Sequence, residues 1–173
     1  DAVPNGLIAG RLSAVPAAFQ TQALELLGWT AEKFARSRDG VHWTKPELGL
    51  YTLEGSSRNN IVLREASQGT VFKDPNPDVR PEHRYKYMAW CLDRGIYVFT
   101  SPDAVHWRRN EAMALPFDPD GSVSVYWDDQ AGGYRAYIRA LVPGGDPTVI
   151  SGSRVLRRIV RARTQELLKP WPF

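Results

Sequence analysis

The sequence predicts an all-β chain made of repeated units of short antiparallel strands. A seven-residue segment that starts at Ser37, Ser-Arg-Asp-Gly-Val-His-Trp, returns 64 residues later from Ser101 as Ser-Pro-Asp-Ala-Val-His-Trp, with five of seven positions identical. Short runs of β-branched and aromatic residues alternate with turn residues, and the 14 Gly and 13 Pro are spread along the chain. Such runs are typical of strands. A repeat of this period indicates copies of one supersecondary unit.

The expected strands follow from these runs and from the repeat. Hairpin connections are predicted at 93–95 and 128–133, where Asp, Arg, Gln and Gly gather between apolar runs. The strands are expected at 32–37, 41–43, 60–64, 84–90, 95–100, 105–107, 123–127 and 133–139.

The repeated segment is interpreted as a tight turn between two strands. Asp39 and Asp103 suit the turn because a short carboxylate accepts hydrogen bonds from backbone N–H groups two residues further on. Gly40 suits a positive φ, and Ala104 in the same conformation is expected to cost roughly 1 kcal/mol. His42 and its counterpart are therefore expected to be structural, together with the Trp that ends each copy.

A third copy is expected near the C-terminus. Thr164 lies 63 residues after Ser101, and Trp171 again ends the segment. Residues 154–168 lack Gly and Pro and place apolar side chains at helical spacing, which favours a helix by propensity. The repeat register predicts a strand over 156–163 instead.

A unit of about 63 residues with four short antiparallel strands has the size of a large propeller blade, and propellers arrange such blades around a central channel. The approximate blades are 1–50, 51–115 and 116–173. We expect about three four-stranded antiparallel blades of a β-propeller with five blades, with an incomplete ring and a chain that is a fragment of a longer one.

Composition narrows the functional classes. The 173 residues are 43% hydrophobic and 24% charged, with a net charge of +3, as in an ordinary globular domain. The single cysteine, Cys91, lies in an apolar run and is expected to be buried, and it excludes an internal disulfide and a thiolate metal cluster. No cofactor or metal is expected, and no apolar run is long enough to cross a membrane.

Several segments resemble a bacterial group of five-bladed propeller proteins related to invertase- and arabinanase-type glycoside hydrolases. The likeness spans roughly residues 30 to 171 and departs from the group at Ala104, where Gly is usual, and at 164–166, where Ser-x-Asp is usual. The segments that carry it are 37–50, 55–62, 71–75, 84–86, 101–103 and 127–128.

The resemblance implies a glycoside hydrolase that acts on an oligo- or polysaccharide through two carboxyl groups, one acid and one base or nucleophile. Asp74, in Phe-Lys-Asp-Pro, and Asp120, seven residues before Trp127, are the candidate catalytic residues. The candidate substrate-binding residues are Asn60, Arg139 and Arg161.

Two other functions compete with this prediction. The chain is alternatively a non-catalytic carbohydrate-binding or scaffold propeller. A third hypothesis is an anion or nucleic-acid binder that uses the arginines of 154–163. It is the weakest, because strand alternation places these arginines on one face without the interleaved aromatics of a stacking platform. The expected partner is a carbohydrate, and neither nucleic acid nor a membrane is expected.

Overall fold

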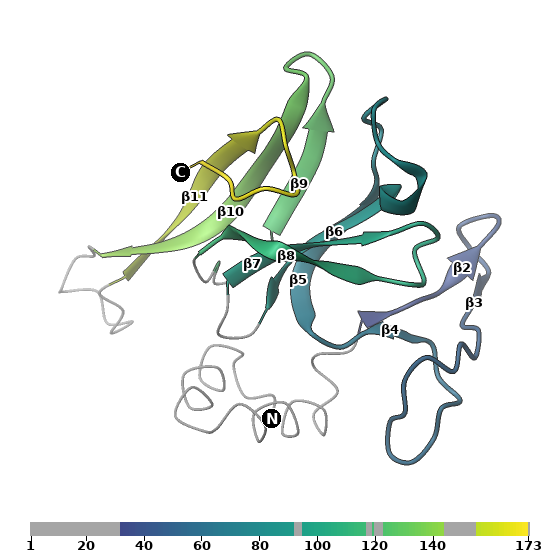
Figure 1. Cartoon of the computed structure of the whole chain (residues 1–173). Helices are drawn as coiled ribbons and strands as arrows, with labels where there is room; N and C mark the ends of the chain where they lie inside the picture. Colours follow the sequence, from purple (N-terminus) through teal and green to yellow (C-terminus); the bar gives the residue numbers. More distant parts are fainter. Residues whose placement is uncertain (1–31, 92–94, 117–118, 120–122, 144–154, 173) are drawn as a thin grey trace. The chain divides into compact units, whose positions relative to one another are not determined.

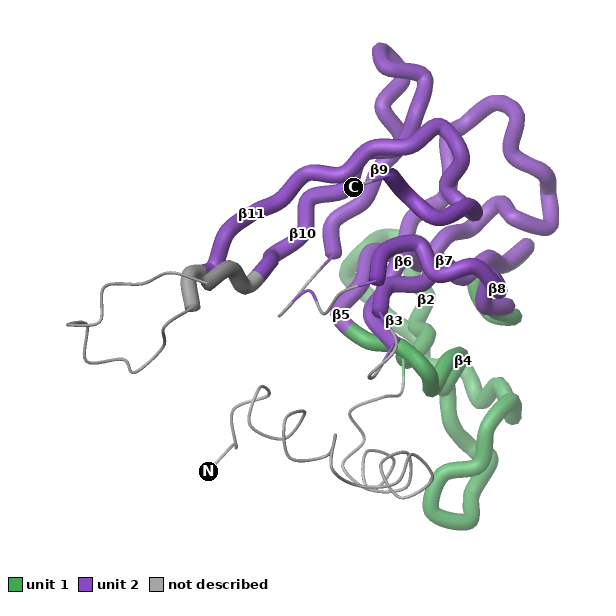
Figure 2. The backbone as a smooth tube through the Cα atoms, turned by 60° about the vertical axis from the view of Figure 1, so that its left-hand side comes forward, with its two compact units in different colours: residues 1–67, 103–107 green, residues 68–102, 108–173 purple. Residues whose placement is uncertain are grey.

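The computed structural model of the chain describes residues 32–91, 95–116, 119, 123–143 and 155–172. Asp120, Arg154 and most of the expected connection at 93–95 lie outside these residues. The chain divides into two compact units, residues 1–67 with 103–107 and residues 68–102 with 108–173 (Figure 2). No helix in the part of the chain that is described has the length and apolar character needed to span a bilayer.

Two sheets make up the second unit (Figure 1). In each sheet a strand lies beside the strand that follows it in the chain, so both sheets are meanders. The first, in the order β5-β6-β7-β8, contains β5 (Ala66–Lys73), β6 (Tyr85–Cys91), β7 (Gly95–Ser101) and β8 (Arg108–Leu115). A 3-10 turn, η1 (Pro81–His83), precedes β6.

The second sheet contains β9 (Val123–Asp128), β10 (Gly133–Pro143) and β11 (Val155–Thr164), with β10 in the middle. The antiparallel pairing of β10 and β11 confirms the predicted strand at 156–163, so the helical spacing there was misleading. The expected turn between β9 and β10 is also present. The Asp128 carboxylate accepts hydrogen bonds from the N–H groups of Gln130 and Ala131, at 3.0 and 3.1 Å.

One hydrophobic core joins these two sheets. Met88 and Val98, which are paired across β6 and β7, face Ala136 and Ile138 of β10 in the same buried cluster. The opposite face of the first sheet is buried as well, with Tyr87 and Phe99 3% and 0% exposed. The core strands β6 and β7 are therefore buried on both faces. Cys91 is buried as expected.

The repeat is visible in the strand registers. Tyr85 pairs with Ser101 in the first sheet, and Tyr134 pairs with Thr164 in the second. Ser101 and Thr164 are the positions that the sequence repeat equates, so each residue of the β6–β7 hairpin has a counterpart in the β10–β11 hairpin.

The strands described in the first unit are short. They are β1 (Glu32–Lys33), β2 (Arg36–Ser37), β3 (Trp43–Thr44) and β4 (Ile61–Leu63), with β1 paired to β4 and β2 to β3. Their registers match those of β7 and β8, because Arg36 pairs with Thr44 as Thr100 pairs with Arg108. By the same pairing, Thr44 corresponds to Arg108 and Leu63 corresponds to Leu115. The first copy therefore has twelve more residues than the second between these two positions, that is, between β3 and the end of β4.

The repeated turn has the same geometry in both copies, as the sequence predicts. Asp39 Oδ1 accepts hydrogen bonds from the N–H groups two and three residues later, at 2.9 and 2.8 Å, and its Oδ2 lies 2.7 Å from His42 Nδ1. Asp103 makes the same three contacts at the same distances. Gly40 has φ of 76° and Ala104 has φ of 65°, so Ala104 does adopt the left-handed conformation.

Some expectations about the fold need correction. Residues 105–107 belong to the turn, and the returning strand β8 begins at Arg108. The sequence reading also overlooked β5, whose stretch Ser-Gln-Gly-Thr lacks apolar residues. Only the first sheet has four described strands, the others have two or three, and none of them closes into a ring.

Candidate functional site

Asp74, one of the two candidate acids, follows β5 and lies in a buried polar network. Its side chain is 0% exposed, and Lys86 Nζ lies 2.9 Å from its Oδ2. The Tyr134 hydroxyl donates to the same oxygen at 2.7 Å, and the Asn76 N–H donates to Oδ1 at 3.1 Å. Lys86 also donates to the His83 carbonyl. A carboxylate held in this way links β5, β6 and β10 and has no surface left for a substrate.

Burial dominates the titration of the groups around Asp74. Burial lowers the pKa of Lys86, and the hydrogen bond and charge of Asp74 oppose that change. Burial also raises the pKa of Tyr134 well above its usual value, while a hydrogen bond from Asn76 acts in the opposite direction. The phenol is therefore a permanent donor to Asp74 at neutral pH.

The second sheet contains a counterpart of this ion pair. Lys86 and Arg135 occupy equivalent positions, one residue after Tyr85 and Tyr134. Arg135 is ion-paired with Asp128 at the end of β9, as Lys86 is with Asp74 after β5. Because each carboxylate is ion-paired with the equivalent basic residue, Asp128 is the counterpart of Asp74 in the second sheet. The prediction that gave this role to Asp120 concerns a residue outside the described part of the chain.

Asn60, a candidate for substrate binding, bonds to the backbone of the first unit. The side-chain Nδ2 of Asn60 donates to the Phe34 carbonyl at 2.6 Å, and the backbone carbonyl of Asn60 accepts the Phe34 N–H at 2.8 Å. These bonds continue the pairing of the strands on either side. In this structure the Asn60 side chain therefore stabilises the pairing of two chain segments through its hydrogen bond to Phe34.

The other two candidates, Arg139 and Arg161, do lie together. Tyr137 pairs with Arg161 across β10 and β11, and Arg139 is two residues further along β10, so all three side chains share one face of the sheet. Tyr126 of β9 is on the same face, and its ring stacks on that of Tyr137 with centroids 6.4 Å apart and an interplanar angle of 11°.

We call this face the outer face of the second sheet. It is open to solvent, since Tyr126, Tyr137 and Ile159 are 42%, 38% and 68% exposed. The arginines of this face come from two strands and are Arg135, Arg139, Arg157, Arg161 and Arg163. Among the described residues, Arg161 and Arg163 have no hydrogen-bond or ion-pair partner. The face combines aromatic rings with positive charge.

The expectation that these arginines lack interleaved aromatics is wrong. It considered β11 alone, where the alternating residues on this face are arginine and isoleucine. The aromatic rings come from the neighbouring strands β9 and β10, which the pairing register places beside the arginines.

A cavity of about 290 Å³ lies at one end of the second sheet. Arg135 and Arg163, which pair across β10 and β11, line it together with Tyr134 and Gln165. Its volume is close to the lower end of the range for small-molecule sites, roughly 300–1,000 Å³. Since Arg135 is ion-paired with Asp128, the positive charge that favours an anionic group in this cavity is that of Arg163.

The first sheet provides an internal comparison for the outer face. The positions of Tyr137 and Arg161 correspond to Met88 and Val98, which are buried against the second sheet. A face with Met and Val at these positions is suited to a core. A face with Tyr and Arg at the same positions is suited to contact with water and a polar ligand.

No protein-family model, curated protein or solved structure matches the chain. Within the described ranges, no group of three or more His, Cys, Asp or Glu side chains is placed to hold a metal ion.

The His83 side chain, which lies next to the buried network of Asp74 and Lys86, should make the stability of the fold depend on pH. Burial, and then the positive charge of Lys86, lower the pKa of His83 below its ordinary 6.5. The unfolded chain therefore binds a proton more readily than the folded one, and stability should fall as pH decreases from above 6.5 through the folded pKa. Urea unfolding at several pH values should show this fall, and His83→Gln should reduce it. An identical pH profile for the variant would contradict the assignment.

Proposed function

We propose that the chain binds acidic polysaccharide through the outer face of the second sheet. The observation that carries this proposal is the stacked pair Tyr126 and Tyr137 beside unpaired Arg161 and Arg163 on an exposed face. Aromatic faces stack on the apolar faces of sugar rings. Guanidinium groups form paired hydrogen bonds with carboxylate or sulfate groups. The resemblance to carbohydrate-active propellers points to the same ligand class.

The arrangement of sheets supports a propeller-type architecture in this proposal. Two consecutive meanders stack face to face, and a repeated turn recurs in register. Successive blades of a propeller are related in the same way. In a closed ring the next blade would cover the outer face, so ligand binding there requires an open arrangement, and the ring of five blades stays a prediction.

A saccharide fits the face better than a nucleic acid does. Single-stranded nucleic acids use separate aromatic side chains for successive bases. Here the two rings are stacked on each other, so they form one platform.

Binding is preferred to hydrolysis because of the environment of Asp74. The catalytic proposal rests on the resemblance, and in this structure the Asp74 carboxylate is fully buried and bonded to Lys86 and Tyr134. A general acid or nucleophile must reach the glycosidic bond. A hydrolase would thus require Asp74 to leave this network.

The test is titration of the protein with polygalacturonate, with neutral dextran and a single-stranded oligonucleotide as comparisons. We expect binding to polygalacturonate only, without release of reducing ends. Tyr137→Ala and the double variant Arg161→Ser/Arg163→Ser should each weaken binding at least tenfold. Tyr51→Ala, a half-buried tyrosine of the first unit, serves as the control and should bind normally.

Three results would overturn the proposal. Tighter and steeply salt-dependent binding to the oligonucleotide would indicate a nucleic-acid surface. Self-association that Tyr137→Ala abolishes would indicate that the outer face is an interface between sheets. Release of reducing ends that Asp74→Asn abolishes, with the variant folded, would support the hydrolase.

A further inference from the structure

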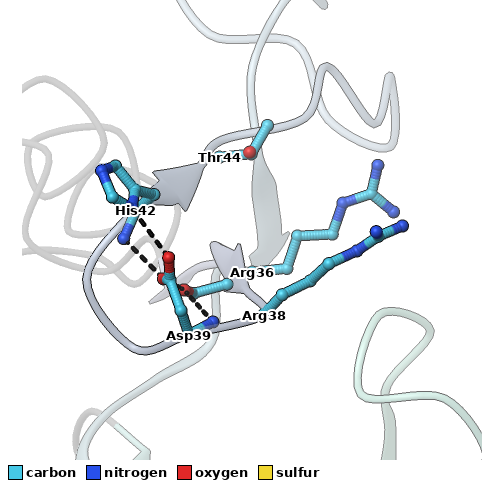
Figure 3. Close-up of a pocket in the computed structure, with 6 residues that line it drawn as sticks. Arg36, Arg38, Asp39, His42 and Thr44 are labelled. Carbon is cyan, nitrogen blue, oxygen red and sulfur yellow. Dashed lines mark hydrogen bonds and ion pairs between the residues drawn. The ribbon is translucent and has the colours of Figure 1, made fainter.

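The first unit contains a cavity of about 580 Å³ beside the repeated turn (Figure 3). It is lined by Arg36, Ser37, Arg38, Asp39, His42 and Thr44. Arg36 is the first residue of strand β2, and Arg38 is the first residue of the turn that follows the strand. In Figure 3 the side chains of both arginines extend to the same side of the turn, away from His42.

These two arginines lack an acidic partner. Neither side chain forms a hydrogen bond or an ion pair with any described residue. Arg36 and Arg38 line one cavity, so their like charges repel each other, and an anion bound in the cavity relieves the repulsion. Arginine pairs are well suited to oxyanions because each guanidinium offers two parallel N–H donors.

Asp39 does not neutralise the pair. Its carboxylate is occupied by the turn itself, with bonds from Ser37, from the N–H groups of Val41 and His42, and from the His42 ring. These bonds, that of the His42 side chain first, hold the pKa of Asp39 well below its usual value. The Asp39 carboxylate is thus already bonded to donors within the turn and does not neutralise the two arginines.

The second copy of the turn shows which residues the fold requires. Asp103, His106 and Trp107 repeat the turn contacts of the first copy. The positions of Arg36 and Arg38 are taken there by Thr100 and Pro102. The turn therefore forms without the arginines, and their presence in the first copy needs another explanation.

We propose that Arg36 and Arg38 form a binding site for an oxyanion, such as a phosphate, sulfate or carboxylate group. The site lies in the first unit and uses none of the residues of the outer face, so it is independent of the polysaccharide proposal. Thr44, at the wall of the same cavity, supplies a hydroxyl donor for the bound group.

The internal repeat also supplies the variant that tests the site. Arg36→Thr/Arg38→Pro gives the first copy the residues of the second, so the turn should still form. Titration with inorganic phosphate, inorganic sulfate and acetate, followed by calorimetry, should show millimolar or tighter binding of at least one ion to the unmodified chain. The variant should bind that ion at least tenfold more weakly, and which ion binds best distinguishes the sources of the oxyanion.

A charge-matched control separates the site from general attraction. Arg84→Thr/Arg108→Thr removes two exposed arginines outside the cavity and should leave ion binding unchanged. Arg36→Lys/Arg38→Lys keeps both charges and should lose part of the affinity, because lysine lacks the paired donors. Equal binding by all variants, or no binding of any ion to the unmodified chain, would overturn the proposal. Circular dichroism confirms that each variant is folded.

Discussion

Replacing Lys86 with methionine is expected to lower the free energy of unfolding by about 3–5 kcal/mol. The change leaves the Asp74 carboxylate, which is 0% exposed, without its cationic partner. The bonds from Tyr134 and Asn76 remain but do not compensate a buried charge. Urea unfolding of the full chain, followed by far-UV circular dichroism, measures the loss.

Two further variants control this result. Lys86→Met/Asp74→Asn removes both charges and keeps an acceptor for Tyr134, so it should recover much of the lost stability, as coupled residues do. Arg58→Met breaks an exposed pair in which Arg58 Nη2 lies 3.0 Å from Glu47 Oε1, and it should cost about 1 kcal/mol or less. Similar losses for Lys86→Met and Arg58→Met would show that the Asp74 network is not a buried ion pair.

The same experiment bears on the role of Asp74. If Asp74 is structural, Asp74→Asn should lower stability and leave polysaccharide binding unchanged. If it is catalytic, the loss should appear in hydrolysis by a folded variant. The position of this residue after a strand and before Pro75 was compatible with both roles, because sequence does not show what lies opposite a carboxylate.

The repeat made much of the fold predictable. It identified β11 as a strand despite helical spacing, because it equated Thr164 with Ser101. It did not reveal β5, where Gly69 lies so close to the Met88 carbonyl that any added Cβ would overlap it. Close backbone approach favours glycine, and glycine weakens the strand signal in the sequence. Close packing of β5 against its neighbouring strand requires a glycine, and this glycine made β5 hard to predict from the sequence.

The candidate site was less predictable because it depends on contacts between strands. Arg139 and Arg161 were identified from sequence, and the register places them on one face. The ring of Tyr126 joins them only through the pairing of β9 with β10. Likewise, the counterpart of Asp74 is Asp128, which is recognised by its ion pair with a basic residue and not by its distance from a tryptophan.

The tryptophans that end the repeat should differ strongly in their contribution to stability. Trp171 is 2% exposed, its indole N–H donates to the Leu167 carbonyl at 3.2 Å, and its backbone N–H donates to Ala114 of β8 at 2.9 Å. Trp171→Ala should therefore cost about 3–5 kcal/mol, as expected for a large side chain removed from a core. Urea unfolding of the full chain measures this loss.

Trp43→Ala is the matched control, because Trp43 occupies the same place in the first copy. Trp43 is 62% exposed, and its indole N–H donates to the Gly40 carbonyl at 3.0 Å. The loss of one exposed hydrogen bond and little buried area should cost about 1 kcal/mol or less. Equal costs for the two variants would mean that burial against the neighbouring strands does not determine the contribution of the tryptophan. Unequal costs in the expected order would show that contact with the neighbouring sheet determines how much each tryptophan stabilises the fold.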